Sequence, residues 1–163
     1  MKKILCLLLF FSLFVPALAD EVALQAADKV LDDFHLAASQ ADGKRYFGHF
    51  TDNAVFLGTD LSERWNKEEF QAYALPYFSK GKGWTYHPKS RHLYLSPDGK
   101  TAWFDEVLEN AKFGLTRGSG VLLLSKNGWK VAQYHLTLPV PNSLIETLVK
   151  MIEAETAQES TRP

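Results

Sequence analysis

Residues 84–138 contain four apolar runs separated by turn signals, and this pattern constrains the fold more than any other feature of the sequence. The runs cover 84–95, 101–109, 113–125 and 129–138. Asn127-Gly128 separates the last two runs, and an Asn-Gly pair between apolar runs is the strongest short signal of a β-hairpin. The turn Ser96-Pro97-Asp98-Gly99 separates the first two in the same way. This part of the chain is therefore predicted to form an antiparallel meander.

The part of the sequence before residue 84 is predicted to be mainly helical. Apolar side chains recur at helical spacing within residues 21–41. Asn66 stands three residues before Glu69, which is typical of a capping box that opens a second helix. A last helix is expected near 142–155, followed by a polar, disordered tail at 156–163. Helices followed by consecutive strands indicate an α+β fold.

The N-terminus has the layout of a secretory signal peptide. Two lysines precede an apolar run at 4–15, and Ala17-Leu18-Ala19 forms a small-x-small cleavage site before Asp20. The run is shorter than the roughly 20 apolar residues that span a bilayer, so no stable membrane anchor is expected. Residues 1–19 are thus predicted to be removed, leaving one exported domain at 20–155, periplasmic or secreted. Cys6 is the only cysteine, so the mature domain is expected to lack a disulfide.

Composition argues against several classes of function. The net charge of the chain is −1, whereas nucleic-acid binding calls for a basic face. His87 and His92 lie five positions apart on a predicted strand and face opposite ways, so no metal site is expected. The sequence contains no phosphate-binding loop and no dinucleotide fingerprint, and no cofactor is predicted.

The predicted turn sets a register for the last hairpin. If Asn127 and Gly128 are the loop residues, Lys126 pairs with Trp129 and Leu122 with Gln133. One sheet face then holds two polar side chains opposite two glycines: Gln133, His135, Gly118 and Gly120. Such glycines leave room for a ligand or mark bends in the strands. A one-residue error in the register would exchange the two faces.

Both faces of this hairpin are largely apolar, so both are expected to be covered. The face with Gln133 and His135 is expected to lie under the helices. The opposite face, which carries Tyr134 and Leu136, is expected to meet a second copy of the chain. The sequence therefore predicts a homodimer.

Short motifs in order between residues 24 and 141 resemble a known family. They are Phe34-His35, Phe56-Leu57-Gly58-Thr59-Asp60, Glu63-Arg64-Trp65, Gly83-Trp84-Thr85, Ala102-Trp103-Phe104-Asp105-Glu106, Arg117-Gly118-Ser119-Gly120-Val121 and Gly128-Trp129-Lys130-Val131-Ala132-Gln133-Tyr134-His135-Leu136. Together they resemble the SnoaL-like branch of the nuclear-transport-factor-2-like superfamily. The resemblance implies a curved antiparallel sheet wrapped around N-terminal helices and enclosing a conical pocket, commonly in a dimer. Superfamily members include ketosteroid isomerases, polyketide cyclases and dehydratases, as well as ligand-binding proteins.

Within such a pocket, Asp105 and His135 are the candidate catalytic bases. His35, Trp65, Trp103 and Gln133 are the candidate ligand-binding residues. For His35 the alternative is a structural hydrogen bond, and for the tryptophans it is a place in the core. Asp105 and its neighbour Glu106 point to opposite faces of a strand, so one can face the pocket while the other pairs with Arg117.

Three functions fit these residues. The first is binding of a small, mostly apolar molecule without turnover, because aromatic side chains with a few polar groups are typical of ligand sites. The second is an isomerase, cyclase or dehydratase that uses a pocket carboxylate or histidine as general base. The third is a protein-interaction module that uses a sheet face or the C-terminal helix.

Overall fold

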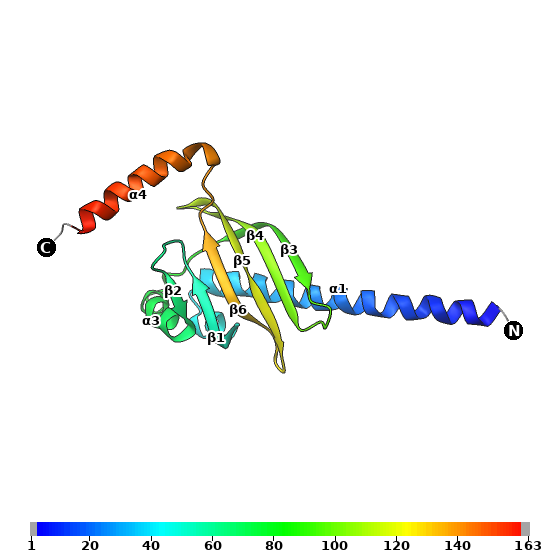
Figure 1. Ribbon diagram of the computed structural model, residues 1–163. Coiled ribbons are helices and arrows are strands. Elements are labelled where there is room, and N and C mark those ends of the chain that lie inside the picture. Colours follow the sequence, from blue (N-terminus) through cyan, green and yellow to red (C-terminus); the bar gives the residue numbers. More distant parts are fainter. Residues whose placement is uncertain (1–2, 161–163) are drawn as a thin grey trace.

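The structure, a computed structural model, describes the backbone of residues 3–160 and the side chains of residues 18–158. Figure 1 shows a curved sheet with helices beside it, as the α+β prediction requires. The elements in chain order are α1 (Lys3–Ser39), α2 (Gly43–Gly48), β1 (Phe50–Leu57), β2 (Arg64–Asn66), α3 (Lys67–Phe78), β3 (His87–Leu95), β4 (Thr101–Asn110), β5 (Gly114–Ser125), β6 (Gly128–Thr137), η1 (Asn142–Leu144) and α4 (Ile145–Ser160).

The six strands form one sheet in the order β2-β1-β6-β5-β4-β3. The meander predicted for the second half of the chain is confirmed, because β3, β4, β5 and β6 pair in antiparallel fashion. The sheet as a whole is mixed rather than antiparallel, since β1 lies parallel to β6. This pairing joins the first half of the chain to the last strand, which no local turn signal could predict.

The helix α1 supplies one side of the core. Its buried side chains Ala27, Leu31, Phe34 and Ala38 recur at helical spacing and pack against the sheet. Figure 1 shows α1 crossing one face of the sheet and continuing well beyond it toward the N-terminus. The predicted signal peptide coincides with the first part of this helix, and its side chains up to residue 17 lie outside the described residues.

The capping box predicted at the start of α3 is confirmed. The Asn66 side chain accepts a hydrogen bond from the Glu69 backbone at 2.9 Å, and the Glu69 carboxylate accepts one from the Asn66 backbone at 2.8 Å. Two orphan backbone donors are satisfied in this way, which sets where α3 begins. The helix then buries Phe70, Ala74 and Phe78 beside β1.

The register predicted for the last hairpin is wrong. Ser125 pairs with Gly128, so the turn residues are Lys126 and Asn127, one position earlier than expected. The register also shifts between Val121 and Leu122, where Ala132 is an extra residue in β6. Such a bulge inverts the alternation of side chains in the strand beyond it.

The bulge turns Tyr134 and Leu136 toward the helices, where they are 2% and 8% exposed. Trp129 and Val131, which precede the bulge, are buried on the same face. The surface expected to form the homodimer is therefore the inner face of the sheet, so this part of the dimer prediction is wrong.

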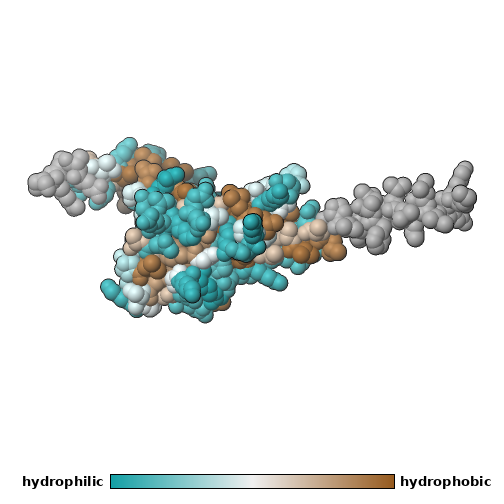
Figure 2. All heavy atoms as spheres, turned by 90° about the horizontal axis from the view of Figure 1, so that it is seen from below, coloured by the Kyte–Doolittle hydropathy of each residue, from teal (hydrophilic) through white to brown (hydrophobic). Residues whose placement is uncertain are grey.

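The C-terminal helix α4 projects away from the sheet (Figure 1). Its apolar side chains Ile145, Val149, Met151 and Ile152 are all exposed, and Figure 2 shows hydrophobic surface along this helix. The helix continues to Ser160, beyond the expected end at 155, because residues 156–160 contain no helix breaker; residues 161–163 lie outside the described residues. Within the described part of the chain, no helix combines the length and apolarity needed to cross a bilayer.

Candidate functional site

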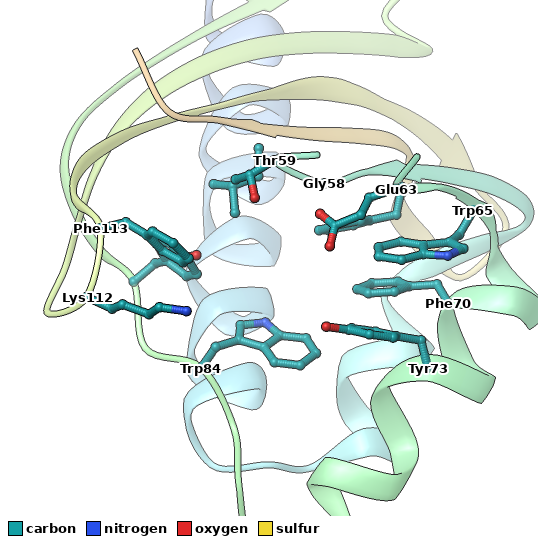
Figure 3. A pocket seen from close by; sticks show the side chains of 12 residues that line it. Gly58, Thr59, Glu63, Trp65, Phe70, Tyr73, Trp84, Lys112 and Phe113 are labelled. Carbon is teal, nitrogen blue, oxygen red and sulfur yellow. The ribbon is translucent and has the colours of Figure 1, made fainter. Parts of the chain in front are cut away.

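A cavity of about 250 Å³ opens between α3, the loop after β1, the segment before β3 and the turn between β4 and β5. Aromatic side chains form most of its wall (Figure 3). The lining residues are Phe56, Gly58, Thr59, Glu63, Trp65, Phe70, Tyr73, Trp84, Tyr86, Lys112, Phe113 and Leu136.

One wall of this cavity is a stack of rings. The Trp65 and Phe70 centroids lie 5.5 Å apart at 8°, and those of Trp65 and Tyr73 lie 4.8 Å apart at 20°. Phe70 and Tyr73 share a face of α3 because they are three residues apart, and Trp65 pairs with Phe56 between β2 and β1. The capping box at the start of α3 therefore also positions this wall.

The cavity continues toward α1 as a narrow extension of about 20 Å³. The two spaces share four lining residues: Phe56, Trp84, Tyr86 and Leu136. The extension is also lined by Phe34, His35, Tyr46 and Tyr134, so it reaches the first helix and the middle of the sheet. His35 thus lies at the deep end of the site.

A buried carboxylate, Glu106, holds this deep end together. Its Oε1 accepts hydrogen bonds from Tyr134 Oη at 2.7 Å and from His35 Nε2 at 2.8 Å. Its Oε2 accepts one from Arg91 Nε at 2.8 Å. Glu106 is fully buried and His35 is only 7% exposed. Every interaction within this group joins different elements of the fold.

Strand register explains why these residues meet. Arg91 of β3, Glu106 of β4 and Gly118 of β5 lie directly opposite one another across the sheet. A Cβ atom at Gly118 would come within 2.3 Å of Tyr134 Oη and 2.8 Å of Glu106 Oε1. The missing side chain therefore leaves the space in which the Tyr134 hydroxyl reaches the carboxylate.

The protonation states follow from these contacts. Burial alone would raise the pKa of Glu106, but His35, Arg91 and Tyr134 outweigh it and hold that pKa below its ordinary value. Burial, together with the charge of Glu106, raises the pKa of Tyr134 well above its ordinary value. Glu106 is thus an ionised acceptor and Tyr134 a neutral donor, so Nε2 of His35 carries the hydrogen that it donates to Glu106.

Arg91 also ties the carboxylate to α1. Its Nη1 donates to Asp28 Oδ1 at 2.5 Å and to Asp32 Oδ1 at 2.9 Å. Two atoms are left without a partner among the buried side-chain polar atoms of the described residues, namely Thr51 Oγ1 and Arg91 Nη2.

The Nδ1 atom of His35 makes no hydrogen bond within the described part of the chain, and it is not among those buried unpaired atoms. Since His35 lines the cavity extension, Nδ1 is the ring nitrogen left for a bound molecule. A ring fixed at Nε2 and open at Nδ1 can accept a hydrogen bond or a proton from a bound molecule.

A second carboxylate, Glu63, lines the cavity. A Cβ atom at Gly58 would come within 2.1 Å of Glu63 Oε2, so the carboxylate rests against the bare backbone of Gly58. The same oxygen accepts a hydrogen bond from the Asp60 backbone at 3.2 Å. Lys112 lies on the opposite side of the cavity in Figure 3, with its Nζ 4.7 Å from the centroid of the Phe113 ring. The described residues contain no group of three or more potential metal ligands.

Residues 27–141, most of the chain, match the SnoaL-like domain. The chain belongs to the SnoaL-like family. No protein with a curated description matches it significantly.

Solved structures support the same fold for this SnoaL-like domain. A dehydratase candidate of the NTF2-like family from Streptomyces avermitilis is 11% identical, with a TM-score of 0.64 over 74% of this chain and 99% of that one. A ketosteroid isomerase-like protein from Erwinia carotovora atroseptica is 19% identical, with a TM-score of 0.54 over 72% and 97%. A protein with a cystatin-like fold from Nostoc punctiforme is 11% identical, with a TM-score of 0.55 over 68% and 86%.

The SnoaL-like domain places only part of the predicted site in its cavity. His35 lines the deep end and Trp65 the aromatic wall, as expected. The expectation that the other four side chains share the cavity is wrong, because they lie on the outer face of the sheet: Trp103, Asp105, Gln133 and His135. Trp103 is 45% exposed there. The bulge at Ala132 causes the exchange for Gln133 and His135, because it inverts the alternation of β6 beyond it. Trp103 and Asp105 lie on the outer face because β4 pairs them with Val121 and Ser119 rather than with the glycines of β5.

Sequence reasoning missed Glu63 and Arg91 of the SnoaL-like site, and it left open whether Asp105 or Glu106 faces the pocket. A signal for Glu106 was available, because it continues the buried alternation of Ala102, Phe104 and Leu108 along β4. The expected partner of such a carboxylate, Arg117, is exposed on the other face, and Arg91 takes that role.

Proposed function

We propose that this SnoaL-like domain binds a small, mostly apolar molecule in the aromatic cavity beside α3. The observation that carries the proposal is a cavity of about 250 Å³ lined by stacked rings and only a few polar groups. Ligand sites have this composition, and a cavity of this size suits a molecule smaller than a typical drug.

Partly exposed rings around the opening support this proposal. Tyr73 is 44% exposed and Phe113 is 37% exposed, although both line the cavity. A ligand that covered this apolar surface would gain about 25 cal/mol for each Å² removed from water. The cavity extension toward His35 adds a place for a polar atom of the ligand at the far end.

Native mass spectrometry of protein purified from its own compartment is the test of binding. We expect a retained small molecule, and we expect Tyr73→Ala to weaken its binding while the melting temperature changes little. Tyr94→Ala is the matched control, since Tyr94 is similarly exposed but lies outside the cavity. Equal weakening by both substitutions, or no small molecule bound by the native protein, would contradict the proposal.

Proton transfer on the bound molecule is a second candidate function, favoured by the geometry of His35. Its Nδ1 atom would remove a proton, while Glu106 would hold the ring and stabilise the imidazolium that forms. The solved structures named as ketosteroid isomerase-like and as a dehydratase candidate agree with this idea at the level of fold alone.

The test of this second function is exchange of ligand C–H hydrogens with deuterated water, followed by NMR. We expect His35→Gln to slow exchange about 100-fold or more while binding is retained. Asp105→Asn, on the outer face, is expected to leave the rate unchanged. Exchange that survives in His35→Gln would exclude His35 as the base.

A further inference from the structure

We propose that the ligand of this cavity is a small organic amine whose protonated nitrogen is bound by the carboxylate of Glu63. This inference rests on the proposed binding function and adds the chemical class of the ligand. Figure 3 shows the Glu63 carboxylate pointing into the open centre of the cavity, between the stacked wall and Thr59.

Glu63 is held in place by the loop that carries it. The Gly58 backbone donates to the Glu63 carbonyl at 2.8 Å, and the Glu63 backbone donates to the Asp60 carbonyl at 3.0 Å. The side chain is fixed as well, since Oε2 rests against Gly58 and accepts the Asp60 N–H. The other oxygen, Oε1, makes no hydrogen bond among the described residues and is the acceptor available to a ligand.

No cation among the described residues forms an ion pair with Glu63. Its carboxylate is nevertheless half-buried beside aromatic rings. Burial raises the pKa of the Tyr73 and Tyr86 hydroxyls, and the nearby negative charge of Glu63 adds to the effect. A neutral apolar ligand would remove water from this carboxylate without replacing it, which is unfavourable. A ligand cation would replace that water with a charge-assisted hydrogen bond.

Lys112, the other charged residue of the lining, imposes a weaker constraint. It lies in the exposed turn between β4 and β5, and a lysine ammonium sits on a flexible four-carbon stem. It can therefore turn toward water when a ligand enters, whereas Glu63 is fixed by its loop. Glu63 therefore decides which ligand charge the cavity prefers, and that charge is positive.

The experiment compares three probes that share a phenyl ring and a short chain. They are 2-phenylethylamine, 2-phenylethanol and 3-phenylpropionate, each titrated at pH 7 into the full chain while tryptophan fluorescence and NMR shifts are followed. We expect the amine to bind about tenfold or more tightly than the alcohol, and the acid to bind most weakly.

Glu63→Gln keeps the shape and the hydrogen bond from Asp60 but removes the charge. We expect it to abolish the preference for the amine over the alcohol, with an unchanged melting temperature as the check on folding. Glu68→Gln is the matched control, because Glu68 is an exposed carboxylate outside the cavity, and it should keep the preference.

The outcomes separate the two proposals. Equal or tighter binding of the alcohol or the acid, or a preference that persists in Glu63→Gln, would overturn the amine assignment and leave the binding function standing. No binding of any of the three probes would instead count against the binding function itself.

Discussion

The carboxylate of Glu106 lies 2.8 Å from Nε2 of His35, although the two residues are 71 positions apart in the sequence. This hydrogen bond joins the middle of the sheet to the first helix inside the core. Arg91 makes a second connection between the same two layers through Asp28 and Asp32. Hydrogen bonds are directional, so these contacts restrict the rotation of α1 about its axis and its position on the sheet more than apolar packing alone would.

Replacing Glu106 by Gln should destabilise the fold strongly. The substitution removes the buried counter-charge of Arg91 and weakens the hydrogen bonds that His35 and Tyr134 donate. Breaking a buried ion pair by removing one partner costs about 3–5 kcal/mol. We expect a loss of that order in the free energy of unfolding, measured by urea denaturation. Asp105→Asn, one position away on the outer face, should change it by less than about 0.5 kcal/mol.

Gly120→Ala should also destabilise the protein, for a steric reason. A Cβ atom at this position would lie 2.2 Å from the Gln133 carbonyl oxygen and 2.9 Å from the Phe104 ring. Overpacking of this kind costs about 1–3 kcal/mol. Gly48→Ala is the control, since nothing lies within 4 Å of a Cβ there, and it should stabilise the protein by about 0.4–1 kcal/mol. Similar melting temperatures for the two variants would contradict this account.

The free energy of unfolding should fall in acid, because protonation of the Asp33 carboxylate breaks its ion pair with Arg45. The pKa of Asp33 is lowered from 3.8 to about 2, mainly by the hydrogen bond from Arg45 and also by the one from His49, while partial burial opposes the shift. A depressed pKa in the folded state contributes stability that is present above pH 3.8 and is lost as the pH falls toward 2. Urea denaturation at a series of pH values from 7 to 2 should show this decline in the free energy of unfolding. In Asp33→Asn the decline between pH 3.8 and about 2 should be smaller. A parallel profile for the variant would contradict the assignment.

A homodimer remains a prediction, now assigned to the outer face of the sheet. Tyr94 and Trp103 stack there with centroids 5.7 Å apart, and they are 48% and 45% exposed. Exposed apolar patches of this kind mark association surfaces. Light scattering should report a dimer for the native protein and a monomer for Trp103→Glu. Leu61→Glu is the control, since Leu61 is fully exposed in the loop after β1. A native monomer at micromolar concentration would refute the dimer.

Export with cleavage after Ala19 is a further prediction. The motive is the small-x-small site Ala17-Leu18-Ala19 behind the apolar run. Intact-mass measurement should give a chain that begins at Asp20, and Ala19→Arg should leave the precursor uncleaved. An exported protein that retains residues 1–19 would show that the cleavage site is wrong.

Some features of this protein could be read from short stretches of sequence because their causes are local. The order of helices and strands follows from hydrophobic periodicity. The start of α3 follows from Asn66 and Glu69, because each side chain accepts a hydrogen bond from the backbone N–H of the other residue. The position of His35 near the apolar stripe of its own helix predicts a side chain that is at least half-buried, because a helix face is defined by residues within a few turns.

The identity of the inner sheet face was decided only by the tertiary structure. Side chains alternate with a period of two, so the single extra residue at Ala132 moves His135 out and Tyr134 in. No local pattern marks that bulge, because it depends on how β5, β6 and α1 pack together. The same holds for the buried carboxylate: the sequence by itself determined that Glu106 alternates with apolar neighbours, whereas only the packed fold brought His35 and Arg91 to it.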